Sequence, residues 1–158
     1  MQIQRVRADN FALWRDQIAE LFNESAKINF SDFIFSDSYG HDKCNEVSAF
    51  LEDGSAIVFV AAEQDILKGW VWCHRFNRLG RTRLHIAEIA VFEQYRKHGI
   101  GNALLKKVED YAKDNSYCEI ELFVTADNTS AVTFYKNASY LAERYLMKKE
   151  IERDKHSC

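Results

Sequence analysis

Residues 89–102 read Ile89-Ala90-Val91-Phe92-Glu93-Gln94-Tyr95-Arg96-Lys97-His98-Gly99-Ile100-Gly101-Asn102. The apolar residues at the start predict the end of a strand, and the residues from Ile100 onward have the apolar spacing of a helix. The first turn of a helix has unpaired N–H groups and the positive end of the helix dipole, which together can bind a phosphate or pyrophosphate. Gly99 and Gly101 lack side chains that would keep phosphate oxygens from the backbone. Because GxG is common by chance, the loop alone could equally be an ordinary strand–helix connection.

The rest of the chain predicts a mixed α/β architecture around this loop. Apolar periodicity and turn residues predict strands over 2–7, 56–63, 66–76, 83–92, 118–125 and 141–151, and helices over 11–23, 43–52, 100–115 and 128–136. The three strands between 56 and 92 are separated by short turns, so they predict an antiparallel meander. Helices that alternate with the later strands are expected to cover the faces of one sheet.

Composition indicates a single soluble domain. The 158 residues predict one domain over 1–151 and a short charged tail over 152–158. A net charge of −3 makes a nucleic-acid partner unlikely on electrostatic grounds. No run reaches the ~20 apolar residues of a membrane span, so we expect a cytoplasmic protein without membrane contact. The four cysteines show no metal-ligand spacing, and we expect no metal.

Two motifs resemble the GNAT superfamily of acyl-CoA-dependent N-acyltransferases. The family motif V-x(4)-[QR]-x-x-G-x-[GA] is matched by Val91, Arg96, Gly99 and Gly101. A second motif, N-x-x-A-x-x-F-Y, is matched by residues 128–135. The resemblance covers most of residues 55–150. It implies the GNAT fold, an α/β fold with a mixed central sheet in which an antiparallel meander is followed by splayed parallel strands, and with helices on both faces.

The resemblance also implies that acetyl-CoA is the co-substrate. Its pantetheine arm would lie between the splayed strands, its pyrophosphate would meet the amides of residues 97–102, and Asn128 would contact it from the other side. The cofactor-binding residues implied in this way are Ile89, Ala90, Val91, Arg96, Lys97, His98, Gly99, Ile100, Gly101, Asn102 and Asn128.

Acyl transfer from a thioester to an amine requires three events. The amine must lose a proton, the oxyanion must be stabilised, and the departing thiolate must gain a proton. Tyr135 matches the family tyrosine that protonates the sulfur, although a purely packing role stays open. Glu88 interrupts an apolar run, and a carboxylate there is costly to bury, so it is the candidate general base. An exposed position or an ion pair would also explain Glu88, and His85 and His74 are alternative bases.

The acceptor is predicted less directly. Ribosomal-protein N-terminal acetyltransferases carry a catalytic glutamate at the position of Phe123, so this residue argues against that substrate class. Aromatic residues in segment 30–41, with Trp70 and Trp72, could line an acceptor pocket or pack in the core. We expect direct attack by a primary amine, most simply that of a small molecule. Acetylation of a protein lysine or N-terminus, and a non-catalytic CoA-binding module, are the alternatives. The resemblance is also compatible with a homodimer.

Overall fold

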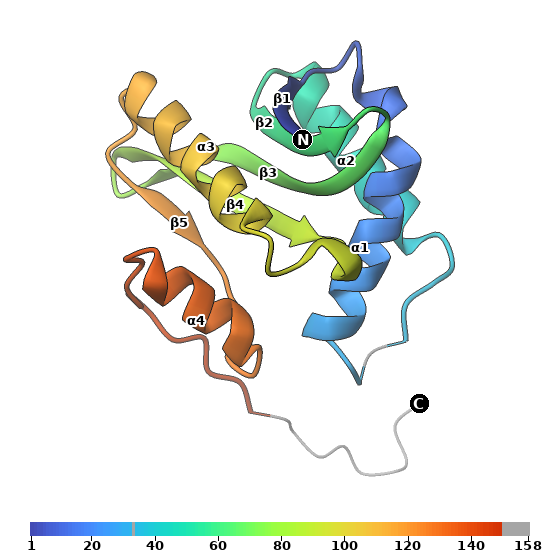
Figure 1. Ribbon diagram of the computed structural model, residues 1–158. Helices are drawn as coiled ribbons and strands as arrows, with labels where there is room; N and C mark the ends of the chain where they lie inside the picture. Colours follow the sequence, from blue (N-terminus) through green and yellow to red (C-terminus); the bar gives the residue numbers. More distant parts are fainter. Residues whose placement is uncertain (33, 150–158) are drawn as a thin grey trace, which may run out of the picture.

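A five-stranded sheet forms the centre of the molecule, with helices on both faces (Figure 1). The computed structural model describes residues 1–32 and 34–149. The tail predicted over 152–158, together with residues 150–151 and Phe33, lies outside the described residues. The strands are β1 Gln2–Val6, β2 Ala56–Glu63, β3 Ile66–Arg78, β4 Arg81–Val91 and β5 Ile120–Leu122. They lie side by side in chain order, β1 to β4 antiparallel and β5 parallel to β4, which confirms the predicted meander and mixed sheet.

The helices divide between the two faces of the sheet. Helices α1 (Arg15–Asn29) and α2 (Tyr39–Glu52) share one core with alternate residues of β2, such as Val58 and Val60. Helix α3 (Ile100–Asp114) packs on the opposite face with Ile57 and Phe59. Because both faces of β2 are covered, its sequence is an almost unbroken apolar run. Helix α4 (Thr129–Asn137) follows β5 and lies beside the end of the sheet at which β5 stops (Figure 1).

Some predicted boundaries differ from the structure. The helix predicted over 11–23 is a 3₁₀ turn, η1 (Phe11–Leu13), followed by α1, which continues to Asn29. Of residues 24–29 only Ala26 is buried, so apolar periodicity could not reveal these last turns. Helix α2 begins earlier than expected, at Tyr39, and β5 is shorter than the predicted 118–125.

The final strand predicted over 141–151 is wrong for its described part. Residues 141–149 form neither strand nor helix, and 150–151 lie outside the described residues. Leu141, Tyr145, Leu146 and Met147 are exposed. Strand preference reflects packing against neighbouring strands, so an apolar pattern cannot show whether a partner strand is within reach.

A β-bulge in β4 shapes the part of the sheet that precedes the loop. Trp72 pairs with Glu88 and Cys73 pairs with Ile86, so Ala87 is an additional residue in β4. The bulge shifts the alternation of side chains by one residue. Glu88 therefore lies on the same face as Trp72, toward α1 and α2. Without the bulge it would point toward α3, on the side of Ile86.

Strands β4 and β5 separate immediately beyond their short pairing. Register pairs join Leu84–Ile86 to Ile120–Leu122 and then end. The backbone N–H of Phe92 donates to the carbonyl of Lys68 at 3.1 Å. After the bulge, the backbone N–H and C=O groups of even-numbered residues therefore point toward β3. By alternation, the backbone groups of Ile89 and Val91 face the open side of β4. This confirms the expected splay.

No helix in the described ranges is long and apolar enough to cross a bilayer.

Candidate active site

The candidate site surrounds the opening between β4 and β5. It is bordered by the N-terminus of α3, by α4 and by the last turns of α1 (Figure 1). Every predicted cofactor-binding residue except Asn128 comes from β4, the loop that follows it or the first turn of α3. Asn128 and Tyr135 come from the start and the interior of α4.

The loop before α3 forms a backbone cradle that fits an anion. Lys97 has a φ of +64° and Gly99 a φ of +78°, which turns the chain tightly into the helix. A Cβ built on Gly99 would meet no atom within 4 Å, so the space in front of this backbone is open. Within the described residues, the N–H groups of residues 97–102 donate to no protein acceptor. Exposed donors at the positive end of a helix suit a pyrophosphate.

Gly101 has a different function from Gly99. A Cβ at Gly101 would lie 3.4 Å from two ring carbons of Phe134. The absence of a side chain at Gly101 therefore lets α4 pack closely against the first turn of α3. The two family motifs meet at this contact, although they are more than 25 residues apart in the sequence.

Arg96 has partners that its predicted role did not include. Its Nε donates to the carbonyl of Val91 at 2.9 Å, and its guanidinium pairs with Glu24 of α1. Glu24 also accepts a hydrogen bond from the N–H of Glu93 at 3.1 Å. Arg96 thus fixes the loop to the end of β4 and to α1. Direct binding of the cofactor by the side chain of Arg96 stays a prediction.

Glu88 lies partly buried where β4 leaves β5. The hydroxyl of Ser25, on α1, donates to Oε1 of Glu88 at 2.6 Å. Burial raises the pKa of Glu88 to about 6, while the hydrogen bond from Ser25 and the charge of Lys43 act in the opposite direction. A carboxyl that titrates close to neutral pH, at the edge of an opening, is suited to proton transfer.

A chain of hydrogen bonds joins Glu88 to the start of α4. Asn29 donates from Nδ2 to the Ser25 hydroxyl at 3.3 Å, and Asn128 donates from Nδ2 to Oδ1 of Asn29 at 2.8 Å. Oδ1 of Asn128 accepts from the N–H of Ala131 at 3.1 Å and so caps α4. The side chain of Asn128 therefore contacts α1 as well as capping its own helix. Its contact with the cofactor stays a prediction.

Ser25 and Asn29 are site residues that the sequence interpretation missed. They lie in the part of α1 beyond the predicted helix end and belong to no motif. Their spacing of four residues places them on one face of a helix. The signal that pointed toward them was the polar Glu88 in an apolar strand, because a buried carboxyl requires a donor.

Tyr135 lies on α4, partly buried, with its ring 5.1 Å from that of Phe134 and 5.8 Å from that of Tyr140. Burial raises its pKa above the ordinary tyrosine value, and the negative charge of Glu88 acts in the same direction. The phenol therefore keeps its proton across the neutral range. Its role as proton donor stays a prediction.

The alternative bases lie elsewhere on the sheet. The rings of His74 and His85 are 5.0 Å apart, and Nδ1 of His85 lies 3.4 Å from Oε1 of Glu121. Burial and then His74 lower the pKa of His85, against the effect of Glu121. Both imidazoles belong to a group of rings beside the opening.

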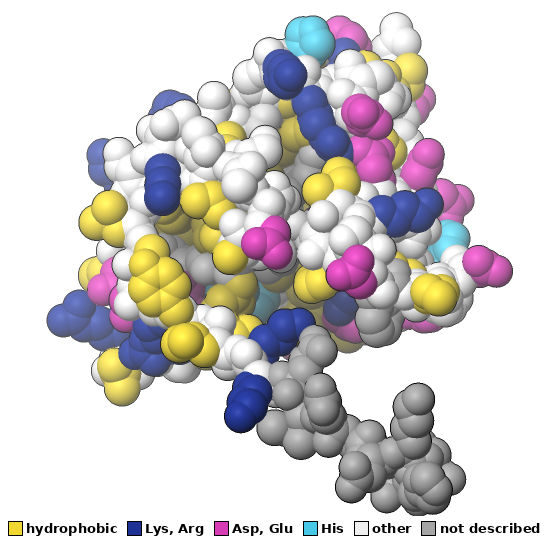
Figure 2. All heavy atoms as spheres, turned by 90° about the horizontal axis from the view of Figure 1, so that it is seen from below, with side chains coloured by type: hydrophobic (Ala, Val, Ile, Leu, Met, Phe, Trp, Pro, Cys, Tyr) yellow, Lys and Arg dark blue, Asp and Glu magenta, His cyan; other side chains and the backbone are white. Residues whose placement is uncertain are grey.

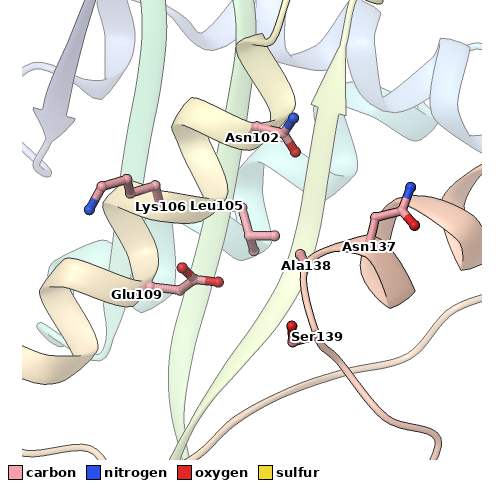
Figure 3. Close-up of a pocket in the computed structure, with 7 residues that line it drawn as sticks. All are labelled: Asn102, Leu105, Lys106, Glu109, Asn137, Ala138 and Ser139. Carbon is pink, nitrogen blue, oxygen red and sulfur yellow. The ribbon is translucent and has the colours of Figure 1, made fainter.

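A groove of about 190 Å³ continues from the cradle between α3 and the turn after α4. Figure 3 shows Leu105 and Glu109 pointing from α3 toward Ala138, with Asn102 at the end nearer the loop.

No group of three or more metal-ligating side chains occurs in the part of the chain that the structure describes.

Known proteins resemble this chain in sequence and in fold. The model of the acetyltransferase (GNAT) family matches residues 15–140. Streptothricin acetyltransferase A of Bacillus subtilis is 41% identical over 73 residues, 41% of this chain and 42% of that protein. N-alpha-acetyltransferase 30 of Schizosaccharomyces pombe is 32% identical over 92 residues, which are 58% of this chain and 61% of that protein.

A solved structure from Pyrococcus furiosus matches 95% of this chain and 100% of that one, with a TM-score of 0.75 and 28% identity. The matches with the first curated relatives span about half the length of those relatives.

Proposed function

Because the chain belongs to the GNAT acetyltransferase family, we propose that it transfers an acetyl group from acetyl-CoA to a primary amine. The observation that carries this proposal is the placement of Glu88. A carboxyl with a pKa of about 6 lies at the open edge of β4, and the protonated Tyr135 lies on α4. The backbone cradle before α3 lies at the end of the same strand.

The residues present fit the expected co-substrate. When bound, acetyl-CoA would supply the thioester that the amine attacks. The cradle N–H groups of residues 97–102 would hold its pyrophosphate, and the groove between α3 and α4 would accept its adenosine. Ile89 and Val91 present backbone groups to the open side of β4. Since the Val91 carbonyl already accepts from Arg96, we expect the Ile89 carbonyl and the Val91 N–H to pair with the pantetheine amides.

Two proton movements are assigned to side chains of the site. Glu88 accepts the proton that the amine nitrogen loses as it bonds to the acetyl carbon. Tyr135 gives its proton to the sulfur as the C–S bond breaks, and regains one from Glu88 in the same cycle. The N–H of Ile89, facing the opening, would stabilise the charge on the carbonyl oxygen. No covalent enzyme intermediate is needed, because both substrates are bound together.

Ser25 and Asn29 act as positioning residues for Glu88. The hydrogen bond from Ser25 stabilises the ionised carboxylate and so keeps its pKa from rising further in a partly buried position. Asn29 and Asn128 tie this bond to the cap of α4, the helix that carries Tyr135. The base and the acid are therefore held by one connected network.

The acceptor that we propose is the amine of a small molecule. The likeness to streptothricin acetyltransferase A supports this class, and so does Phe123, at the position where ribosomal-protein acetyltransferases carry glutamate. Cytoplasmic location and dimer formation remain proposals.

Calorimetric titration of the full chain tests the proposal. Acetyl-CoA and CoA should bind, whereas ATP and NAD should not, because only the former pair carries the pantetheine arm that meets β4. Absence of binding by acetyl-CoA and CoA would mean that the cradle is only structural and would contradict the proposal.

A further inference from the structure

Six aromatic and imidazole rings gather on the face of β3 and β4 that carries Glu88. This ring cluster consists of Phe50, Trp72, His74, Phe76, His85 and Phe123. Its neighbouring ring centroids lie 5.0–6.2 Å apart. Such distances are typical of stacked and tilted ring pairs. The cluster is contributed by α2, β3, β4 and the residue after β5, so it is assembled only in the folded chain.

The ring cluster extends directly from the candidate base. Trp72 is the register partner of Glu88, and His74 is the partner of His85, so all four side chains share one face. Phe123 comes immediately after β5 ends, where the opening between β4 and β5 begins. Figure 2 shows the molecule from below, where the surface is hollowed and hydrophobic side chains and a histidine lie on the floor of the hollow.

Two observations indicate that a ligand covers this cluster. Phe123 is 81% exposed and Phe76 is 39% exposed, although both rings pack against His85. Exposed apolar surface of this kind, next to a reactive group, marks a binding site. In addition, Trp72 is only 6% exposed, and its buried Nε1–H group has no hydrogen-bond acceptor among the described residues.

The charges around the cluster indicate what the ligand is not. Three carboxylates lie near the edge of the cluster, and each forms an ion pair with Arg83. The N–O distances are 2.5 Å to Glu119, 3.0 Å to Glu121 and 3.2 Å to Glu143. Arg78 adds a contact to Glu121 at 3.4 Å. Because these carboxylates are already paired with arginines, they would attract a polycationic substrate only weakly. Burial lowers the pKa of His85, so its imidazole is neutral near pH 7 and offers a flat apolar face.

We propose that the ring cluster is the acceptor subsite and that the acceptor is a small primary amine carrying an aromatic ring. The substrate ring would stack on Phe123 and His85, and a short linker would bring the amine to Glu88. This inference rests on the function proposed above and specifies its substrate class.

Binding measurements test the subsite independently of turnover. 2-Phenylethylamine and n-butylamine, which share a primary amine but differ in the ring, are titrated into the full chain with and without CoA. We expect the ring-bearing amine to bind at least tenfold more tightly. Phe123→Ala should weaken it about fivefold to tenfold and leave butylamine unchanged, because a ring–ring contact is lost. Phe123→Leu should restore only part of the loss. Leu13→Ala, which removes another exposed apolar side chain, is the matched control.

The outcomes separate this inference from the proposed function. Equal binding of the two amines, tighter binding of spermidine, or no effect of Phe123→Ala would overturn the aromatic subsite. Tighter binding of a peptide with N-terminal phenylalanine would overturn the small-molecule class. If 2-phenylethylamine binds as expected but is not acetylated when acetyl-CoA is present, the subsite stands and the proposed acetyltransferase activity fails.

Discussion

Replacing Glu88 by glutamine should make the protein more stable and less active. In the folded chain burial raises the pKa of Glu88 from 4.5 to about 6. A carboxyl with a raised pKa binds its proton more tightly when folded, so stability falls as the pH rises from about 4.5 through about 6. This pKa change corresponds to about 2 kcal/mol. Since the side chain is only partly buried, we expect about 1–2 kcal/mol.

The assay is urea unfolding of the wild type and Glu88→Gln between pH 4 and pH 8. Near pH 4 both carry a neutral group at position 88, and their free energies of unfolding should be similar. At pH 7.5 the variant should be more stable by about 1–2 kcal/mol. Comparing the two pH values cancels any constant change in the bond to Ser25. Glu20→Gln, at an exposed position of α1, is the matched control for the loss of one carboxyl group.

Two results would refute the reasoning. If the stability difference is the same at pH 4 and pH 7.5, burial does not disfavour the charge on Glu88. If the variant is less stable at pH 7.5, the carboxylate has a stabilising cationic partner. Under the proposed function, kcat should also fall on the order of 10²–10⁴-fold, because a general base is lost. Unchanged kcat would remove Glu88 from the mechanism while leaving the stability argument intact.

Further predictions concern the proton donor, the positioning residues and the cradle. Tyr135→Phe should lower kcat on the order of 10²-fold and leave the KM for acetyl-CoA unchanged. An unaltered kcat from pH 6 to pH 10 would exclude its role as the acid. Ser25→Ala should move the acidic limb of the kcat/KM profile to higher pH, because the hydroxyl lowers the pKa of Glu88. A limb that stays in place would show that this bond does not tune the base. Gly99→Glu should weaken acetyl-CoA binding on the order of 100-fold by calorimetry, through like-charge repulsion. Gly80→Glu has a matching φ of +76° in a distant turn and should bind normally, so equal losses would locate the pyrophosphate elsewhere.

Local sequence patterns were sufficient to predict the central elements. The meander, α3 and α4 each have a regular apolar spacing and end at recognisable residues, such as the cap Asn128. The open loop before α3 could also be predicted, because its free N–H groups and its glycine at positive φ depend on neighbouring residues. Phosphate binding by this loop stays a prediction. The sequence singled out Glu88 as a polar residue in an apolar strand, but it left open whether the carboxyl is buried or exposed.

Contacts between distant residues could not be predicted in this way. Ser25 and Glu88 are 63 residues apart, and Asn29 and Asn128 are 99 apart. Arg96 matched a motif, but its partner Glu24 lay beyond the predicted end of a helix whose last turns bury only Ala26. The segment 141–149 has a strand-like pattern and no strand partner within the described residues.

The sequence by itself determined most of the segments that form the sheet and helices, and the place where a glycine-containing loop leads into α3. These features depend on periodicity and on residues close together in the chain. Only the tertiary structure decided which face of β4 carries Glu88, because one inserted residue at Ala87 reverses the alternation. It also decided which hydroxyl contacts that carboxyl and which rings lie beside it. Those contacts arise when α1, α2, β5 and α4 pack around β4, and packing between distant elements leaves no local pattern in the sequence.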